Sequence, residues 1–350
     1  MHEGKYSTSP EWADIQPIPL DDGSNDGQGA SPLAAIAYKP EYLEATSYLR
    51  AVMAVDEMSE RALQLTEDVI MMNPAHYTVW LYRAKILFAL DKDLTQELAW
   101  LNKVSLKYLK NYQIWHHRQQ LLSSKSHFHS LPAGEQDFLM QMFDSDSKNY
   151  HVWSYRQWLV RQFDLWDEPR EIADVDALIE MDVRNNSAWN HRYLLRFAPR
   201  EEAEAAMAPG GSYTPAEKGR LDVVDEDVVE AELDYAQKKI LLAPENRSPW
   251  LYARGVLRAA GRSLAEWKGF ASRFITEEVG GDETIVHVKS SLALEWLADV
   301  YSEEAGELAE DKRQEKVGEA VKMLNLLKEK YDPIRRNYWD YKIGQLSVAA

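Results

Sequence analysis

The stretch from Lys110 to Arg118 reads Lys-Asn-Tyr-Gln-Ile-Trp-His-His-Arg, and its outline recurs along the chain. The shared pattern is an asparagine, an aromatic residue, two further residues, a tryptophan, two further residues and an arginine. Full or partial copies lie at residues 73–83, 149–156, 185–192, 246–254 and, in a weaker form, 335–342. Successive tryptophans are separated by 35, 38 and 36 residues, at Trp80, Trp115, Trp153 and Trp189. A period of this length is typical of a repeated pair of helices.

Each part of the pattern predicts a role in a helix. An asparagine four residues before the tryptophan suits an N-cap, and in the first copy we expect Asn73 to be the cap with Pro74 at the first helical position. Tryptophan and arginine three residues apart lie on one helical face, so the indole fills space between hairpins and the guanidinium reaches carbonyls or carboxylates. The residues given this structural role are Trp80, Arg83, Trp115, Arg118, Trp153, Arg156, Trp189, Arg192 and Trp250.

The last two copies depart from the pattern. Arg254 follows Trp250 by four residues instead of three, and Lys342 takes the place of the arginine in the sixth copy. Terminal repeats are commonly atypical because they cap the stack. We therefore expect one continuous helical solenoid that ends near the sixth copy.

The repeats define the expected domain organisation. Residues 1–32, rich in Pro, Gly, Asp and Ser, are predicted to be extended, with Trp12 and Ile15 pinned on a surface. Residues 33–350 are predicted to form a single helical repeat domain without strands. Its repeats are expected near 73–87, 109–122, 147–160, 183–196 and 244–258, with a degenerate copy near 333–346.

The C-terminal half of the repeat domain contains the main irregularity. Trp189 and Trp250 are 61 residues apart, and the surplus includes two Gly and two Pro within eight residues. This composition predicts a loop insertion at about 207–219. Beyond it, further helices are expected at about 263–278, 284–304 and 310–330.

Composition excludes several classes of function. The formal net charge of −17 argues against a general phosphate-binding surface, so no nucleic-acid partner is expected. The chain has no cysteine, which excludes disulfides, a thiol nucleophile and thiolate zinc ligands. His116-His117 and the pair His127 and His129 lack the spacing of metal ligands, so no metal site is predicted in this chain. No signal segment and no apolar run of about 18 residues occurs, which predicts a cytoplasmic protein.

One group of residues could bind a ligand. Residues just before the motif tryptophans occupy equivalent positions of successive repeats, and they combine cations, phenols and amides that suit an anionic or peptide ligand. The alternative is that they only make helix caps and hydrogen bonds between repeats. The members of this row are His76, Tyr77, Lys110, Tyr112, Gln113, Lys148, Tyr150, His151 and Arg184.

The repeats also resemble a known family. They are similar to consecutive repeats of the α subunit shared by protein farnesyltransferase and type I geranylgeranyltransferase, and the likeness extends from about residue 6 to residue 346. The residues that carry it are HYTVWLYR at 76–83, LKNYQIWHHR at 109–118, SKNYHVWSYRQWLV at 147–160, DVRNNSAWNHRYLL at 182–195, EWADIQPIP at 11–19 and YLRAVMAVDEMSERALQLTEDVI at 48–70.

The resemblance implies a fold and an activity. The fold is an all-α, right-handed superhelical solenoid, a tetratricopeptide-like crescent of antiparallel helical hairpins that wraps a β subunit. The activity, present only in the heterodimer, is transfer of a farnesyl or geranylgeranyl group from its diphosphate to the cysteine of C-terminal CaaX sequences, as in Ras- and Rho-type GTPases. The resemblance also implies a zinc ion bound by the β subunit, and magnesium for the farnesyl reaction.

Family roles can be assigned to six residues of the row. Lys110 corresponds to a lysine that binds the diphosphate, and Tyr112 lies next to it. Tyr150 and His151 correspond to residues that contact the diphosphate as its C–O bond breaks. Gln113 corresponds to a glutamine that hydrogen-bonds the acceptor peptide's terminal carboxylate, and Tyr77 to a tyrosine near the peptide path. Lys148 and Arg184 match the repeat but have no family role.

Two other kinds of protein share part of this repeat pattern. The α subunit of Rab geranylgeranyltransferase has related repeats, but the segment at 11–19 and the succession of KNYQ and NYH resemble the farnesyl type. A non-catalytic tetratricopeptide-like scaffold would show a similar period, but its consensus lacks the Trp-x-x-Arg pattern. The sequence leaves open which β subunit accompanies the chain, and therefore which lipid is transferred.

Overall fold

The structure is a computed structural model that describes residues 4–20, 37–198, 225–280 and 283–348. The chain divides into two compact units, Met1–Phe163 and Asp164–Ala350, and each is described by itself. The predicted insertion at 207–219 lies outside the described residues. The single domain predicted for residues 33–350 stays a prediction.

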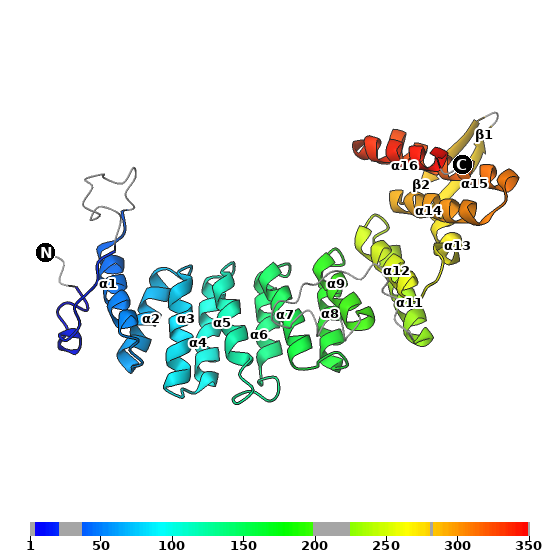
Figure 1. Cartoon of the computed structure of the whole chain (residues 1–350). Helices are drawn as coiled ribbons and strands as arrows, with labels where there is room; N and C mark the ends of the chain where they lie inside the picture. Colours follow the sequence, from blue (N-terminus) through cyan, green and yellow to red (C-terminus); the bar gives the residue numbers. More distant parts are fainter. Residues whose placement is uncertain (1–3, 21–36, 199–224, 281–282, 349–350) are drawn as a thin grey trace. The chain divides into compact units, whose positions relative to one another are not determined.

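The first unit is a series of helical hairpins (Figure 1). Each hairpin pairs a leading helix with a helix that carries the sequence motif: α2 contacts α3, α4 contacts α5, and α6 contacts α7. The motif helices also contact one another in the order α3, α5, α7, so they form a continuous layer. The elements are η1 (Pro10–Trp12), α1 (Pro40–Ala54), α2 (Glu60–Met72), α3 (Tyr77–Ala89), α4 (Leu94–Lys107), α5 (Tyr112–Leu122), α6 (Glu135–Ser145) and α7 (Tyr150–Gln162).

The motif asparagines cap their helices, as predicted, in four of the repeats. The Asn111 side chain accepts hydrogen bonds from the amides of Gln113 and Ile114, and Asn149 does the same at the start of α7. Asn185 and Asn246 are the corresponding caps in the second unit. These caps fix where each motif helix begins.

The cap predicted for the first copy was wrong. Asn73 is instead the C-cap of α2, and α3 begins only at Tyr77. The side-chain oxygen Oδ1 of Asn73 accepts from the backbone N–H of Ala75 at 3.2 Å, which closes a local turn in place of a helix start. The side-chain Nδ2 of Asn73 donates to the Tyr42 hydroxyl at 3.0 Å, which ties this turn to α1.

The motif tryptophans form the core between hairpins, as predicted. Trp80, Trp115 and Trp153 are buried in the first unit, and Trp189 and Trp250 in the second. The indole N–H of Trp153 donates to the carbonyl of Ser147, six residues earlier, at 2.9 Å. The same bond to the sixth residue back is made by Trp80, Trp189 and Trp250. These four indoles therefore tie their motif helices to the turns before them.

The N-terminal segment covers the first hairpin. Trp12 is buried and packs edge-on against Tyr6 and Tyr48, with ring centroids 5.3 and 5.5 Å away. Arg61 of α2 lies over the Trp12 ring and makes two hydrogen bonds to the carboxylate of Asp14. The predicted pinning of this segment by Trp12 is confirmed, with a turn of 3-10 helix at 10–12.

The second unit begins with the same kind of hairpin. Helix α8 (Pro169–Met181) contacts α9 (Asn186–Phe197), α11 (Glu226–Leu242) contacts α12 (Arg247–Ala259), and α9 contacts α12. The more irregular C-terminal part contains η2 (Leu264–Trp267), α13 (Lys268–Ser272), β1 (Ile275–Gly280), β2 (Glu283–Val288), α14 (Ser291–Glu307), α15 (Glu310–Leu326), a π-helical turn η3 (Leu327–Tyr331), η4 (Pro333–Arg335) and α16 (Arg336–Val348). Among the described residues, no helix is both long enough and apolar enough to cross a membrane.

The prediction that no strand occurs was wrong. Strands β1 and β2 pair antiparallel, with Ile275 opposite Val288 and Gly280 opposite Glu283. They replace the end of the helix expected at 263–278 and the start of the one expected at 284–304. Both segments are rich in β-branched residues, and the Gly-Gly-Asp between them favours a turn, so strand propensity prevails over the weak helical pattern.

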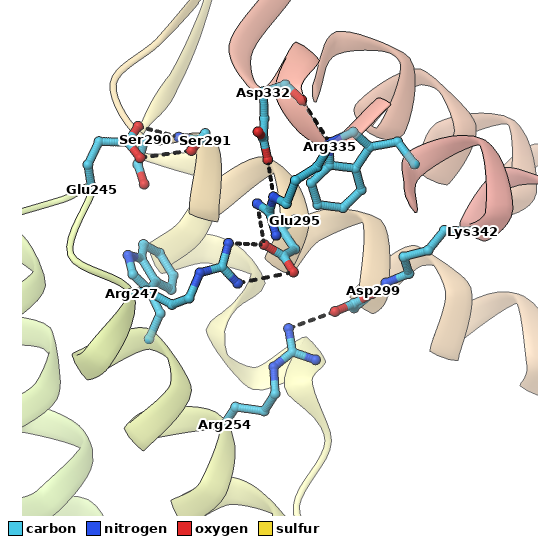
Figure 2. Close-up of polar contacts among 12 residues, drawn as sticks. Glu245, Arg247, Arg254, Ser290, Ser291, Glu295, Asp299, Asp332, Arg335 and Lys342 are labelled. Carbon is cyan, nitrogen blue, oxygen red and sulfur yellow. Dashed lines mark hydrogen bonds and ion pairs between the residues drawn. The ribbon is translucent and has the colours of Figure 1, made fainter. Parts of the chain in front are cut away.

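The two atypical copies of the motif meet in the C-terminal half of the second unit (Figure 2). Arg254 of α12 and Lys342 of α16 both pair with the carboxylate of Asp299 in α14, the arginine at 2.7 Å. Beside them, Glu295 accepts from Arg247 at 3.0 Å and lies 3.6 Å from Arg335. The displaced Arg254 therefore pairs with an aspartate of α14, and the sixth copy of the motif shares that aspartate.

Candidate functional site

The motif arginines fix the geometry of the hairpins by pairing with buried glutamates. Arg83 of α3 makes two hydrogen bonds of 2.7 Å to the carboxylate of Glu97 in α4, the leading helix of the next hairpin. Arg118 pairs in the same two-pronged way with Glu135 in α6, and Arg192 with Glu232 in α11. These three pairs are called the buried ion-pair ladder, and they confirm that the guanidiniums of Arg83, Arg118 and Arg192 reach carboxylates.

A second side chain donates a hydrogen bond to the carboxylate of each of these glutamates. The residue two places after the next tryptophan donates to the same carboxylate: His117 to Glu97 at 3.0 Å, Tyr155 to Glu135 at 2.6 Å and Tyr252 to Glu232 at 2.8 Å. An ionised carboxylate only accepts hydrogen bonds, so the Nε2 atom of His117 carries the proton. Each buried carboxylate is thus bound by a cation from the repeat before it and a donor from its own repeat.

The pKa values follow from these contacts. Burial raises the pKa of the Glu97 carboxyl, but the hydrogen bonds from His117 and Arg83 outweigh burial and bring this pKa to about 2. Burial lowers the pKa of His117, so its imidazole stays neutral beside the carboxylate. Burial and the neighbouring Glu135 raise the pKa of Tyr155 well above its usual value. At the first pair, Glu97 is therefore ionised at neutral pH and His117 is a neutral hydrogen-bond donor.

The side chains at the starts of α5 and α7 form an exposed edge of the first unit. Tyr112 and Tyr150 are the first residues of these two helices, and both side chains are exposed, that of Tyr150 by 77%. The His151 ring lies between them, 6.5 Å from the Tyr112 ring and 5.7 Å from the Tyr150 ring. The structure therefore brings together three of the predicted site residues, from two neighbouring repeats.

Lys110 lies at the same edge, immediately before the cap of α5. Its side chain is 74% exposed, and its ammonium group pairs with the Oδ2 atom of Asp146 at the end of α6. The hydrogen bond from Lys110 lowers the pKa of Asp146, so this carboxylate is ionised at neutral pH. An exposed ammonium with most of its surface in solvent can bind an anion directly.

The two remaining site residues differ in their surroundings. Tyr77 is the first residue of α3 and is 61% exposed, so it repeats the position of Tyr112 and Tyr150 one hairpin earlier. Gln113 is only 6% exposed, and its backbone amide is taken by the cap residue Asn111. Tyr77 therefore belongs to the open edge, whereas Gln113 lies beneath it.

The edge can bind an anion, but metal ligands are not gathered in the described part of the chain. Within residues 4–20, 37–198, 225–280 and 283–348, no group of three or more His, Asp or Glu side chains could hold a metal ion. Lys110 and His151 supply positive charge or N–H donors, and the tyrosines supply hydroxyl donors. The starts of α5 and α7 add the partial positive charge of two helix N-termini.

The sequence reasoning missed the acidic partners. Glu97, Glu135 and Glu232 occur in leading helices, and Asp146 in the turn before α7; none was singled out beforehand. A signal was present for the first three, because each is followed three residues later by an aromatic residue on which the motif arginine stacks. These stacking pairs are Arg83 on Trp100, Arg118 on Phe138 and Arg192 on Tyr235.

A known protein family matches this chain in four stretches, each of which is one helical hairpin of the structure. Residues 59–90, 94–125, 132–163 and 169–197 match the family described as protein prenyltransferase alpha subunit repeat. Each matched stretch contains one leading helix and one motif helix, from α2–α3 to α8–α9.

Longer similarities extend over the whole chain. The protein farnesyltransferase/geranylgeranyltransferase type-1 subunit alpha of Candida albicans is 35% identical over 351 residues, covering 99% of this chain and 99% of that protein. The solved structure of Candida albicans protein geranylgeranyltransferase-I complexed with GGPP matches with a TM-score of 0.77 and 34% identity, over 99% of this chain and 100% of the matched chain.

A type-2 relative matches less of the chain than the Candida albicans subunit does. The geranylgeranyl transferase type-2 subunit alpha of Bos taurus is 30% identical, but over 63% of this chain and 37% of its own length. The Candida albicans subunit, in contrast, is matched over 99% of both chains. On that basis, this chain belongs to the family of α subunits shared by protein farnesyltransferase and geranylgeranyltransferase type 1.

Proposed function

We infer that this chain is the α subunit of a heterodimeric protein prenyltransferase and is active only when joined to a β subunit. The enzyme transfers a farnesyl or geranylgeranyl group from its diphosphate to the cysteine thiol of a C-terminal CaaX sequence. The observation that carries this inference is the 35% identity over 99% of the chain to an α subunit named for both activities. The substrates are cytoplasmic proteins of the Ras and Rho type.

The exposed edge has the chemistry for the diphosphate in this reaction. As the bond between the isoprenyl carbon and the diphosphate oxygen breaks, the oxygen keeps the electron pair and negative charge grows on the leaving group. The sulfur of the acceptor cysteine, which gives up its proton to solvent, forms the carbon–sulfur bond on the opposite side of the same carbon. Lys110 neutralises the growing charge, and the Tyr150 hydroxyl and His151 ring donate hydrogen bonds to it. Groups that bind the transition state more tightly than the ground state raise the rate of the chemical step.

The peptide substrate uses other residues of the same edge. Tyr112 borders the diphosphate site, and Tyr77 borders the path of the peptide one hairpin earlier. Gln113, although buried, is the residue that we assign to the terminal carboxylate of the peptide. Its burial supports a role as a fixed donor, because a packed side chain loses little further freedom on binding.

The metal ions of the reaction are assigned to the partner. This chain does not fit a zinc site, because it has no cysteine and its described residues form no group of three His, Asp or Glu ligands. The zinc ion belongs to the β subunit, and magnesium is a further cofactor of the farnesyl reaction. We derive no step of this chain through either ion.

A partner subunit also explains the apolar side chains left exposed at the hairpin turns. At the turn between α2 and α3 these are Met71, Met72 and Tyr77, and the later turns expose Tyr112 and Tyr150. A row of exposed apolar side chains of this kind is typical of a protein–protein interface. A β subunit that covers the edge would also exclude water from the diphosphate.

Single-turnover kinetics on the purified heterodimer test the function. The chain is co-expressed with candidate β subunits, and the partner that co-purifies decides which lipid diphosphate is used. Lys110→Ala should slow prenyl transfer about 10²-fold, the scale for removing one preorganised charge-stabilising group. Lys103→Ala, which removes an exposed lysine of α4, is the matched control. An unchanged rate for Lys110→Ala would remove Lys110 from the mechanism, and no transfer by any heterodimer would refute the function.

A further inference from the structure

The Lys110–Asp146 pair contains a residue whose role is still unexplained. Asp146 closes the turn between α6 and α7, where its Oδ1 atom accepts the backbone N–H of Lys148 at 3.3 Å. Its other oxygen, Oδ2, binds the ammonium group of Lys110 from the preceding repeat. One carboxylate therefore serves a local turn and a lysine 36 positions earlier in the chain.

The turn does not require the negative charge. Asn73 occupies the same place in the first repeat, seven residues before the motif tryptophan, and its neutral side chain accepts the N–H of Ala75 at 3.2 Å. An amide oxygen closes this turn as well as a carboxylate oxygen does. Asp182 closes the turn of a later repeat with a carboxylate oxygen, by accepting the N–H of Arg184 at 2.9 Å, so this position accepts either side chain. What the charge of Asp146 adds is the contact of Oδ2 with Lys110.

The contact leaves the lysine available to a ligand. An ammonium group has three N–H donors, and Asp146 accepts only one of them. The Lys110 side chain is 74% exposed, whereas that of Asp146 is 24% exposed. The more buried carboxylate therefore anchors the ammonium group, whose remaining donors are left for solvent or a ligand at the edge where Tyr112, Tyr150 and His151 lie.

We propose that Asp146 is a positioning residue for prenyl transfer, which holds Lys110 in the orientation that stabilises the departing diphosphate. This inference rests on the proposed function of the edge. A free lysine samples many rotamers, and fixing them costs entropy that Asp146 removes before the substrate arrives. The carboxylate acts through Lys110 and does not itself contact the diphosphate.

The same charge has an opposite effect on binding. A carboxylate close to a diphosphate repels it, so Asp146 weakens binding of the lipid diphosphate in the ground state. Removing the charge should therefore slow the chemical step without raising the dissociation constant of the lipid. A purely structural residue would not separate the two quantities in this direction.

The test uses Asp146→Asn in the purified heterodimer. Asparagine keeps the turn, since Asn73 makes it, and removes only the charge. We expect the single-turnover rate at saturating lipid diphosphate to fall about tenfold, the scale of reordering one lysine side chain, while the dissociation constant of farnesyl or geranylgeranyl diphosphate stays equal or falls. Asp146→Glu should restore part of the rate. Asp144→Asn, which removes an exposed charge two residues away on α6, should leave the rate unchanged.

A double-mutant cycle with Lys110→Ala separates the possible results. If Asp146 acts through Lys110, Asp146→Asn causes no further loss in the Lys110→Ala background. An equal loss in both backgrounds, or a wild-type rate for Asp146→Asn, would overturn the positioning role while the proposed function stands. A wild-type rate for Lys110→Ala itself would instead refute the role of the edge, and the positioning role with it.

Discussion

The Arg118–Glu135 and Lys110–Asp146 pairs both join the second motif segment to α6, yet their environments are opposite. The side chains of the first pair are 1% and 2% exposed, and those of the second are 74% and 24% exposed. The arginine lies three residues after the tryptophan and points into the stack, whereas the lysine lies five residues before it, outside the helix. One repeat thus supplies a buried cation that stabilises the fold and an exposed cation that can bind a ligand.

Breaking the buried pair should have the largest effect on stability. Glu135→Ala leaves the Arg118 guanidinium and the Tyr155 hydroxyl buried without their shared acceptor, so the free energy of unfolding should fall by about 3–5 kcal/mol. Urea unfolding of the full chain, followed by circular dichroism, measures this loss. Glu135→Gln keeps one acceptor oxygen and should cost less. A loss below about 1 kcal/mol for Glu135→Ala would mean that the ladder does not hold the hairpins together.

Acid should weaken the same ladder at Glu97. Its pKa is lowered from 4.5 to about 2 in the folded chain, so the unfolded chain binds the proton first as pH falls. The stabilisation is therefore complete above about pH 4.5 and is lost as pH falls towards 2, by something on the order of 3 kcal/mol. Glu97→Gln lowers stability at neutral pH but should flatten this part of the pH profile. An equally steep profile for Glu97→Gln would assign the acid sensitivity to other carboxylates.

Removing the Asp299 carboxylate should have an intermediate effect on stability. Its partners Arg254 and Lys342 are 26% and 23% exposed, so both cations can be hydrated when the carboxylate is removed. Asp299→Asn should therefore cost about 1 kcal/mol, between the costs for the buried and the exposed pair. Urea unfolding at low and high salt measures it, and high salt should reduce the difference. A cost as large as that of Glu135→Ala would show that exposure does not set the energy of these pairs.

The regular repeats were predictable because their signals are local. A cap asparagine, a tryptophan and an arginine at fixed spacing specify where a helix begins and which face is buried. The arginine's partner was not predictable in the same way, because Glu97 and Glu135 lie in the next leading helix and are identified only when the hairpins stack. The strands at 275–280 and 283–288 were missed because their β-branched residues lie between helices in the sequence and carry no copy of the motif.

The exposed edge was predicted through the repeat as well. Tyr77, Tyr112 and Tyr150 share one position, three residues before the tryptophan, so a stack of hairpins brings the last two near each other. Asp146 could not be predicted, since the turn it closes is equally well closed by asparagine. Its contact with Lys110 depends on the distance between two turns, which sequence spacing does not give.

The smallest effect on stability is expected at the exposed pair. Lys110→Ala removes an ammonium that is mostly hydrated, and Asp146 is exposed enough to be hydrated when its partner is lost, so the free energy of unfolding should change by no more than about 0.5 kcal/mol. The measurement is urea unfolding beside Glu135→Ala, with Lys103→Ala as the surface control. A change of 2 kcal/mol or more would show that Lys110 holds the repeats together, and a slow turnover in this variant would then report damaged structure. A stability equal to that of the control, together with a rate about 10²-fold lower in the heterodimer, would assign the lysine to the reaction, because stability and rate are then affected by different cations of the same repeat.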